Sequence, residues 1–245
     1  MGDHAEVDLY LKVREKEGRL YSDDVVTKLP AFHKNHSLSN EWQVRSHSAV
    51  RLRKYLSSKN TSLKILDLGC GNGWLSNSLS QDNHIVLGVD QNKIELKQAA
   101  RVFLSSAEDG GTSRELSFLE TDIFSAPFPK ESFDVILLAS AIQYFPNLLD
   151  LIKTLFYYLK PHGEIHIMDT PFYSETEFED AVRRSEKYYS SLGFSEMSQY
   201  YFHHRIKDLE KFSVKWLYRP NLFLLRFQKM FGKIASPFPW VVIKK

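Results

Sequence analysis

The feature that most constrains the fold is the stretch Ile65–Ser76, in which a short apolar segment runs into a glycine-rich turn and then into a helical segment. Residues Leu63–Leu68 predict a strand, and the helix is expected to begin near Gly73. Gly69, Gly71 and Gly73 can adopt positive φ and carry no Cβ, so backbone N–H groups and the helix N-terminus can approach a ligand closely. The stretch therefore predicts a nucleotide-binding turn after a strand of an α/β sheet.

Two carboxylates strengthen this interpretation. Asp67 lies two residues before the first glycine, and a second apolar segment, Ile85–Val89, ends in Asp90. A carboxylate about 20 residues beyond the turn is placed to accept hydrogen bonds from a pair of ribose hydroxyls. The glycine spacing, Gly-x-Gly-x-Gly, differs from the Gly-x-Gly-x-x-Gly of dinucleotide-binding proteins, whose backbone passes a pyrophosphate. The pattern therefore favours a nucleoside ligand without a pyrophosphate.

The sequence Asp-Leu-Gly-Cys-Gly-Asn-Gly at 67–73 resembles the first motif of class I S-adenosylmethionine-dependent methyltransferases. The resemblance continues in the family's order through residues 88–90, 120–122, 133–139 and 159–169, and so covers roughly residues 63–170. It implies a methyltransferase with S-adenosyl-L-methionine as cofactor, acting on a small-molecule acceptor at oxygen, nitrogen or carbon.

The same resemblance implies that the glycine turn and several strand ends contact the methyl donor. The expected cofactor-binding residues are Asp67, Gly69, Cys70, Gly71, Gly73, Asp90, Gln91, Asp122, Ile123 and Ala139. In the family, an acidic residue at the position of Asp122 accepts a hydrogen bond from the adenine amino group, and its neighbour, here Ile123, packs on the ring. The alternative for Asp122 is that it caps a turn.

The acceptor is expected beyond the fourth strand, Phe133–Ala139, because ligands of open α/β sheets lie at the carboxyl ends of the strands. The candidate substrate-facing residues are Gln143, Tyr144 and Tyr173, the last of which follows the fifth strand together with Asp169 and Pro171. The alternative for Gln143 is a helix cap, and for Tyr144 it is a packed aromatic side chain. No metal-ligand spacing of Cys and His is present, so no metal is expected.

The resemblance and the pattern of segments predict an α/β fold with a Rossmann-like, seven-stranded, mostly parallel sheet sandwiched by helices, its last strand antiparallel. Besides the segments above, strands are expected at 116–119, 164–168, 199–205 and 240–243, and helices at 3–17, 40–58, 74–80, 92–104, 147–159 and 176–192. Ser39 or Asn40 is expected to cap the second helix, and Gln91 or Asn92 the fourth. Residues 1–60 are expected to cover the cofactor and substrate site, and 61–245 to form the methyltransferase core.

Within that core, residues 206–237 are interpreted as a lid-like insert. Apolar and basic side chains alternate there, a pattern that suits a helix on the sheet edge, an acceptor-binding element or a contact with a membrane surface through 215–235. The first of these is favoured.

Composition narrows the class of function. The 245 residues suit one α/β domain with additional elements, and a formal charge of +2 gives no argument for a nucleic-acid partner. The single cysteine, Cys70, excludes an internal disulfide and fits a reducing compartment. The acidic start lacks the apolar region of a secretory signal, and the longest apolar run, Val135–Ile142, is too short to span a bilayer. We therefore expect a soluble, cytoplasmic protein.

Methyl transfer needs two aligned reactants and a proton acceptor where the acceptor demands one. The histidines that could act as general base are His33, His36, His203 and His204, each of which could equally be a solvated side chain. No Asn/Asp-Pro-Pro-Tyr/Phe follows the fourth strand, which argues against methylases of amide or adenine amino groups. Three alternatives remain: a regulator that binds S-adenosylmethionine without turnover, a methyltransferase of protein or RNA, and, least favoured, an NAD-dependent oxidoreductase.

Overall fold

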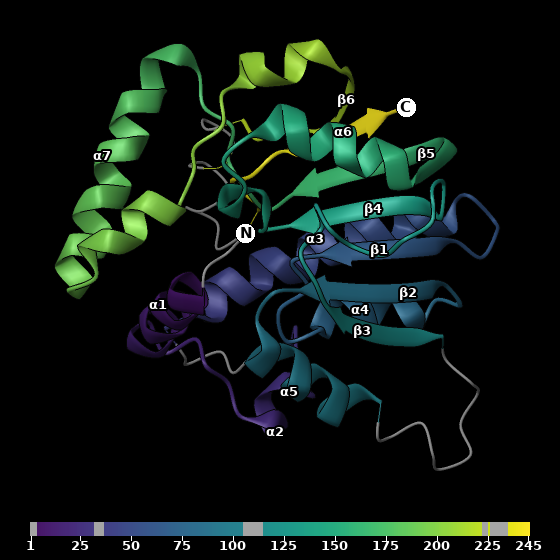
Figure 1. The fold of residues 1–245 in the computed structure, drawn as a ribbon, viewed down its shortest axis with the longest axis horizontal. Helices are drawn as coiled ribbons and strands as arrows, with labels where there is room; N and C mark the ends of the chain where they lie inside the picture. Colours follow the sequence, from purple (N-terminus) through teal and green to yellow (C-terminus); the bar gives the residue numbers. More distant parts are fainter. Residues whose placement is uncertain (1–3, 32–36, 105–114, 222–224, 226–234) are drawn as a thin grey trace.

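The computed structural model describes residues 4–31, 37–104, 115–221, 225 and 235–245 of the chain, and these contain a seven-stranded sheet (Figure 1). The strands are β1 (Lys64–Leu68), β2 (Ile85–Asp90), β3 (Leu116–Glu120), β4 (Phe133–Ala139), β5 (Leu159–Met168), β6 (Ser213–Tyr218) and β7 (Trp240–Lys244). Their spatial order is β3-β2-β1-β4-β5-β7-β6.

The first five strands are parallel to one another, and β7 is antiparallel to both of its neighbours, β5 and β6. The predicted seven-stranded sheet with an antiparallel last strand is therefore confirmed. Because β2 and β3 lie on one side of β1 while β4 and β5 lie on the other, the order of the strands reverses between β1 and β4. In open α/β sheets a ligand binds at this switch point, outside the carboxyl ends of the strands.

Helices cover both faces of the sheet. The α-helices are α1 (His4–Lys16), α2 (Asp23–Val26), α3 (Ser39–Ser57), α4 (Trp74–Ser80), α5 (Lys93–Phe103), α6 (Leu148–Tyr158) and α7 (Glu175–Leu192). Short 3₁₀ turns follow at η2 (Ile142–Tyr144), η3 (Ser195–Tyr200) and η4 (Ile206–Lys211). One apolar core joins α6 to the sheet, and a second joins α3 and α4 to the opposite face. α1 and α7 lie at the carboxyl end of the parallel strands (Figure 1).

Two of the predicted helix starts can be compared directly. Asn92 caps α5, since its side-chain oxygen accepts hydrogen bonds from the N–H groups of Ile94 and Glu95, as predicted. The predicted cap of α3 is wrong: Ser39 is already the first residue of the helix, and the N-cap position is held by Leu38 without a capping side chain.

The predicted sixth strand at 199–205 is also wrong. That segment is the end of η3 followed by irregular chain, whose one pairing is an isolated bridge between Tyr173 and Arg205. Its aromatic residues Tyr200 and Tyr201 pack on the apolar cluster that joins α1 to α7. This packing explains why the segment is apolar although it forms no β-sheet hydrogen bonds as a strand would. The sixth strand is β6, which lies inside the segment interpreted from the sequence as an insert.

The fifth strand begins earlier than predicted. α6 ends at Tyr158 as the Pro and Gly signal at 160–163 predicts, but β5 starts directly at Leu159. Its register against β4 shifts between Leu159 and Glu164, and His162 adopts a left-handed φ of 66° within the irregularity. The turn signal therefore marks a β-bulge rather than a loop.

Candidate functional site

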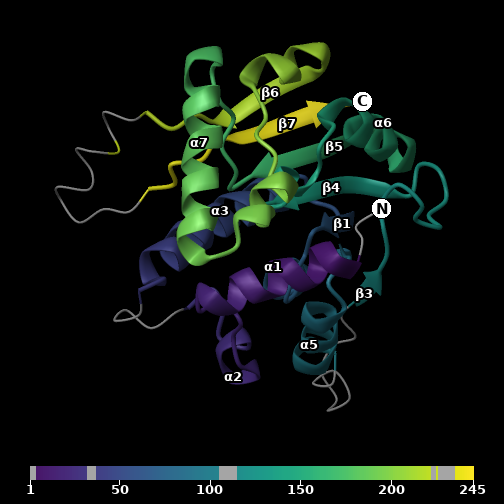
Figure 2. The ribbon, with the colours of Figure 1, turned by 60° about the vertical axis from the view of Figure 1, so that its left-hand side comes forward.

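A cavity of about 210 Å³ lies at the switch point, where the carboxyl ends of β1, β2, β4 and β5 face the N-terminal helices. Figure 2, in which this end of the sheet is turned forward, shows α1 running across it, with α7 above and α5 below. The residues that line the cavity from α1, α3 and the chain between them are Glu6, Val7, Tyr10, Arg14, Arg19, Tyr21, Glu41, Trp42 and Arg45. The wall opposite is formed by the glycine turn and by the residues that follow each strand.

The glycine turn is fastened to the end of β2. The N–H groups of Gly69 and Cys70 donate to the carbonyl oxygen of Val89, at 2.7 and 3.1 Å. The N–H of Gly71 donates to Oδ2 of Asp90 at 2.8 Å, and the N–H of Asn92 donates to Oδ1 at 2.8 Å. Two backbone donors therefore orient the Asp90 carboxylate at the cavity wall, and each of its oxygens has a further lone pair for a ligand.

The three glycines of the turn lack a side chain for different reasons. A Cβ on Gly73, where φ is +74°, would lie 2.6 to 2.8 Å from the Phe118 ring and the Ala99 methyl, so this glycine serves helix and sheet packing. A Cβ on Gly69 would lie 2.6 Å from that of Ala141. A Cβ on Gly71, where φ is +53°, would meet nothing nearer than a Glu95 carboxylate oxygen at 3.5 Å. Gly71 is thus the position where backbone is open to a ligand, as a nucleoside cradle requires.

Buried carboxylates surround this turn. Burial raises the pKa of Asp67 to about 6 although the Ser76 hydroxyl donates to it at 2.6 Å. Burial, and then the neighbouring Asp90, raise the pKa of Glu95 to about 7, and burial also raises the pKa of Asp90 itself. Among the described residues that line the cavity there are six carboxylates against three arginines. The cavity is therefore suited to a ligand with positive charge, such as a sulfonium.

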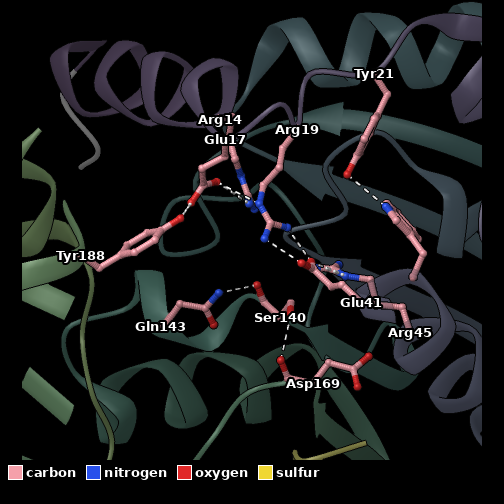
Figure 3. A network of polar contacts seen from close by, with 11 residues as sticks. Arg14, Glu17, Arg19, Tyr21, Glu41, Arg45, Ser140, Gln143, Asp169 and Tyr188 are labelled. Atoms are coloured by element: carbon pink, nitrogen blue, oxygen red, sulfur yellow. Dashed lines mark hydrogen bonds and ion pairs between the residues drawn. The ribbon is translucent and has the colours of Figure 1, made fainter. Parts of the chain in front are cut away.

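A polar network joins the elements that cover the cavity (Figure 3). Arg19 makes two hydrogen bonds to the carboxylate of Glu41, at 2.5 and 2.6 Å, and Arg45 donates to the same carboxylate at 3.0 Å. Burial raises the pKa of Glu41, but the hydrogen bonds and charges of Arg19 and Arg45 outweigh it and lower that pKa to about 2. On the other side, the Tyr188 hydroxyl of α7 donates to Glu17, which also pairs with Arg19. α1, α3 and α7 are thereby linked around the cavity mouth.

The structure brings most of the predicted site residues together. Those that line the cavity are Asp67, Gly69, Cys70, Gly71, Asp90, Gln91, Ile123, Ala139 and Tyr144. Gly73, Asp122, Gln143 and Tyr173 do not line it. The carboxylate of Asp122 instead accepts a hydrogen bond from the N–H of Phe124 at 3.0 Å, which is the turn-forming alternative, while its neighbours Thr121 and Ile123 face the cavity.

Gln143 and Tyr173 have structural surroundings. The buried Gln143 side chain donates to the carbonyl of Ser140 at 2.6 Å and accepts from the Thr170 hydroxyl at 3.1 Å, so it ties the end of β4 to the end of β5. Tyr173 packs against His203, with ring centroids 5.5 Å apart. Neither side chain lines the cavity, because Gln143 is engaged in hydrogen bonds and Tyr173 in a ring contact with neighbouring residues.

None of the predicted histidine bases lines the cavity in the described part of the chain. His203 contacts the Ser185 hydroxyl of α7 at 2.9 Å, and the buried His204 contacts the carbonyl of Ile142 at 3.0 Å. Burial lowers the pKa of both. His33 and His36 lie outside the described residues.

Other cavity residues were not predicted. Tyr10 and Arg14 come from α1, Trp42 from α3, and Glu95 from the first turn of α5. A weakly amphipathic helix far ahead of the first strand carries no local sign of which face meets a ligand. Glu95, in contrast, follows Asp90 by five positions and just past the helix cap, a spacing that could have indicated its place.

An open α/β sheet with a glycine turn and a strand-end carboxylate at its switch point defines a nucleoside-binding protein of the Rossmann-like class. The chain belongs to the methyltransferase domain family, whose sequence profile matches residues 59–219. The resemblance drawn from the motifs is thus confirmed.

Individual relatives agree with this assignment. The chain is similar to a sterol 24-C-methyltransferase of Aspergillus fumigatus, 33% identical over 102 residues, which are 41% of this chain and 26% of that protein. It is similar to a ubiquinone biosynthesis O-methyltransferase of Pasteurella multocida, 32% identical over 109 residues, which are 43% of this chain and 45% of that protein. The chain therefore spans less than half the length of these curated relatives.

The fold is also similar to solved structures. The geranyl diphosphate C-methyltransferase of Streptomyces coelicolor A3(2), solved with Mg²⁺, geranyl diphosphate and S-adenosyl-L-homocysteine, matches with a TM-score of 0.60 at 13% identity, covering 99% of this chain and 98% of that chain. At this identity the match shows the fold alone.

The described residues contain no group of three or more His, Cys, Asp or Glu side chains arranged to hold a metal ion. No helix in the part of the chain that the structure describes is long and apolar enough to cross a membrane.

Proposed function

We propose that the protein transfers a methyl group from S-adenosylmethionine to a small-molecule acceptor. The observation that carries the proposal is Asp90, whose carboxylate is held by the N–H groups of Gly71 and Asn92 beside the open glycine turn in the switch-point cavity. A carboxylate oriented in this way accepts hydrogen bonds from a ribose hydroxyl pair, and Gly71 leaves room for the nucleoside to lie against the backbone.

The other donor contacts follow from the same cavity. Ile123 offers an apolar surface for the adenine ring, and Ala139 lies at the end of β4, next to the switch point. Bound S-adenosylmethionine supplies a methyl group made electrophilic by the sulfonium charge. The carboxylates Asp67, Asp90 and Glu95 give the donor side of the cavity a negative charge that favours this cation over a neutral nucleoside.

The acceptor enters the same cavity from the side of α1 and the ends of β4 and β5. Tyr10, Tyr144, Phe145 and Met197 supply aromatic and apolar surface there. In this proposal residues 1–60 form the cover of the site, and the acceptor is smaller than a macromolecule because α1 lies across the strand ends. The names of the relatives refer to small molecules, a sterol and ubiquinone, which supports this choice over a protein or RNA substrate. The single cysteine, Cys70, is buried and free, which suits a cytoplasmic enzyme.

The test is calorimetric titration of the purified protein with S-adenosylhomocysteine, with NAD run in parallel. Micromolar binding of S-adenosylhomocysteine is expected, weakened at least about 30-fold by Asp90→Ala, since the ribose hydroxyls lose a charged acceptor. The matched control Asp180→Ala, on the exposed surface of α7, should leave the affinity unchanged. Binding of NAD alone, or of neither ligand, would contradict the proposal.

Turnover separates an enzyme from a binding regulator. Incubation with methyl-labelled S-adenosylmethionine and a panel of phenols, amines and isoprenoids should label at least one acceptor. Tight donor binding with no labelled product in this panel or in a protein and RNA fraction would favour the regulator.

A further inference from the structure

Asp169 is a cavity residue that donor binding does not use. It directly follows β5 and lines the cavity beside Ser140, which directly follows β4. Both residues hold left-handed backbone, with φ of 57° for Asp169 and 58° for Ser140. Such conformations cost on the order of 1 kcal/mol for residues other than glycine and persist where the surroundings hold them.

The backbone around Asp169 is tied at two points. The N–H of Ser140 donates to the carbonyl of Met168 at 2.9 Å, and the Ser140 hydroxyl donates to the carbonyl of Asp169 at 2.8 Å. The side chain is held separately: Oδ1 accepts a hydrogen bond from the Ser48 hydroxyl of α3 at 2.6 Å. Among the described residues no other hydrogen bond to this carboxylate is found, so the second oxygen retains its capacity to accept.

The place of Asp169 in the sheet separates it from the donor carboxylates. Asp67 and Asp90 belong to β1 and β2, on one side of the switch point, whereas Ser140 and Asp169 belong to β4 and β5, on the other. A nucleoside held by the glycine turn and Asp90 occupies the first side, so the second side receives the group to be methylated.

In the part of the chain that the structure describes, neither Glu41 nor a lysine or histidine competes with Asp169 for this role. Glu41 is bound by Arg19 and Arg45, and neither lysine nor histidine lines the cavity among the described residues. Burial raises the pKa of Asp169, opposed by the Ser48 hydrogen bond and by the charges of Arg45 and Arg51. A carboxylate of raised basicity with one oxygen anchored and the other available has the properties of a proton acceptor.

We propose that Asp169 accepts a hydrogen bond from an O–H or N–H group of the methyl acceptor, orients its lone pair and receives its proton. This inference rests on the proposed function. In the step, the acceptor's lone pair forms the bond to the methyl carbon, and the electrons of the breaking C–S bond remain on sulfur, which becomes a neutral thioether. The proton of the attacking oxygen or nitrogen passes to the Asp169 carboxylate and from there to water. The acceptor class is thus a hydroxyl or amine compound.

The test uses sinefungin, which carries an amine in place of the sulfonium methyl, against S-adenosylhomocysteine, which has nothing there. The protonated amine places N–H donors at the point of transfer, where the proposal expects the Asp169 carboxylate to accept a hydrogen bond. Wild-type protein is expected to bind sinefungin about 10-fold more tightly than S-adenosylhomocysteine. Asp169→Asn should reduce this ratio at least about five-fold while the affinity for S-adenosylhomocysteine stays within about two-fold. That second affinity also reports whether the variant is folded.

A control and a second variant complete the design. Asp180→Asn removes the same unit of charge from the exposed surface of α7, outside the cavity lining, and should leave the ratio unchanged. Ser48→Ala removes the hydrogen bond that anchors Asp169, together with a longer contact from Arg51 at 3.3 Å, at a helix position where alanine is favourable. It should lower the ratio about two- to three-fold.

Several outcomes overturn the inference. They are a wild-type ratio near one, a ratio that neither Asp169→Asn nor Ser48→Ala lowers, and an equal loss in Asp180→Asn. Failure of the wild type to bind S-adenosylhomocysteine at all overturns the proposed function as well, whereas normal binding with an unaltered ratio removes only the role of Asp169. Labelling of hydroxyl and of amine acceptors in separate arms distinguishes oxygen from nitrogen, and labelling of carbon acceptors alone contradicts the proposal.

Discussion

The buried carboxylate of Glu95, at the donor site, destabilises the fold when it is ionised. Its carboxylate accepts from the Asn92 side chain at 2.9 Å, close to the Asp90 carboxylate that the glycine turn also holds. Burial and the charge of Asp90 raise its pKa to about 7, so the native protein without a ligand binds a proton that the unfolded chain releases near pH 4.5. The free energy of unfolding therefore falls as the pH rises from about 4.5 to about 7.

We expect Glu95→Gln to remove this pH dependence. The neutral amide retains a carbonyl that can accept from Asn92 but carries no charge. The free energy of unfolding of the variant, relative to wild type, should rise between pH 5 and pH 8 by about 2 kcal/mol, because each unit of pKa shift corresponds to about 1.4 kcal/mol. Urea unfolding at pH 5, 6, 7 and 8 measures the difference. Parallel stability profiles of the two proteins would show that Glu95 is not the group that titrates.

At the scale of elements, α3 connects the cavity to the far end of the sheet. Its Trp42, Arg45 and Ser48 face the cavity region, and its Tyr55 reaches Glu164 of β5. The Glu164 side chain is 3% exposed, yet it accepts from the Tyr55 hydroxyl at 3.0 Å and pairs with the Lys59 and Lys244 ammonium groups at 2.9 and 3.1 Å.

A histidine completes this buried network. The indole N–H of Trp240 donates to Nδ1 of His166 at 3.1 Å, which leaves Nε2 to carry the proton and donate to Glu164 at 3.3 Å. Burial lowers the pKa of His166, so the ring is neutral near pH 7. β5, β7 and α3 are thus joined through one carboxylate.

We expect Glu164→Gln to destabilise the protein by about 1.5 to 3 kcal/mol at pH 7, because a neutral amide replaces the buried carboxylate that accepts from Tyr55, His166 and two lysines. Burial raises the pKa of Glu164, but its hydrogen bonds from His166, Lys59 and Lys244 outweigh this and hold that pKa below its usual range. The stabilisation is therefore present above about pH 4.5 and is lost as the pH falls through the folded-state pKa. Urea unfolding at pH 7, pH 4 and pH 2.5 follows both the loss in the variant and its decline toward acid pH.

The control for this variant is Glu131→Gln, which removes an exposed carboxylate that also pairs with lysines. Exposed pairs contribute little, so its unfolding midpoint should match that of wild type. Equal losses in the two variants would mean that lysine pairing in general, rather than the buried network, is responsible.

At the scale of the whole molecule, the cavity exists because two distant parts of the chain meet over the strand ends. A small apolar cluster of Val13, Tyr189 and Met197 joins α1 to α7 and η3, apart from the two cores of the sheet. Partly buried aromatic residues, Tyr10 and Tyr144 among them, pack on this cluster and also line the cavity. The docking of α1 is therefore coupled to the shape of the acceptor side.

We expect Val13→Ala to loosen α1 without unfolding the sheet. Loss of two buried methyl groups costs roughly 1 to 2 kcal/mol, and here the cost falls on a local unit. Hydrogen exchange of the α1 amides should accelerate about 10-fold while β4 amides keep their protection, and S-adenosylhomocysteine should bind a few-fold more weakly. Equal acceleration in α1 and β4 would show that α1 unfolds only together with the core.

The sequence by itself determined the structural features that depend only on residues close together in the chain. The strand, glycine turn and helix at 65–76, the carboxylate Asp90 at the next strand end, and the Asn92 cap are each specified by backbone conformations that a few adjacent residues allow. The continuous apolar run of β4 likewise predicts a strand buried on both faces, because a parallel central strand has no exposed side. The family resemblance then predicted a mostly parallel, seven-stranded sheet whose last strand is antiparallel.

Tertiary structure decided what depends on partners far along the chain. The aromatic-rich segment at 199–205 resembles a strand in its sequence, but its tyrosines pack on α1 and α7, while the sixth strand is the edge strand β6. The sequence predicted that Gln143 faces the substrate, but in the fold its side chain accepts a hydrogen bond from Thr170, 27 residues away. Asp169 faces the cavity because Ser48, 121 residues away, anchors it. Local pattern specifies which conformations a segment can adopt, but only packing against remote segments decides which side chains remain available to a ligand.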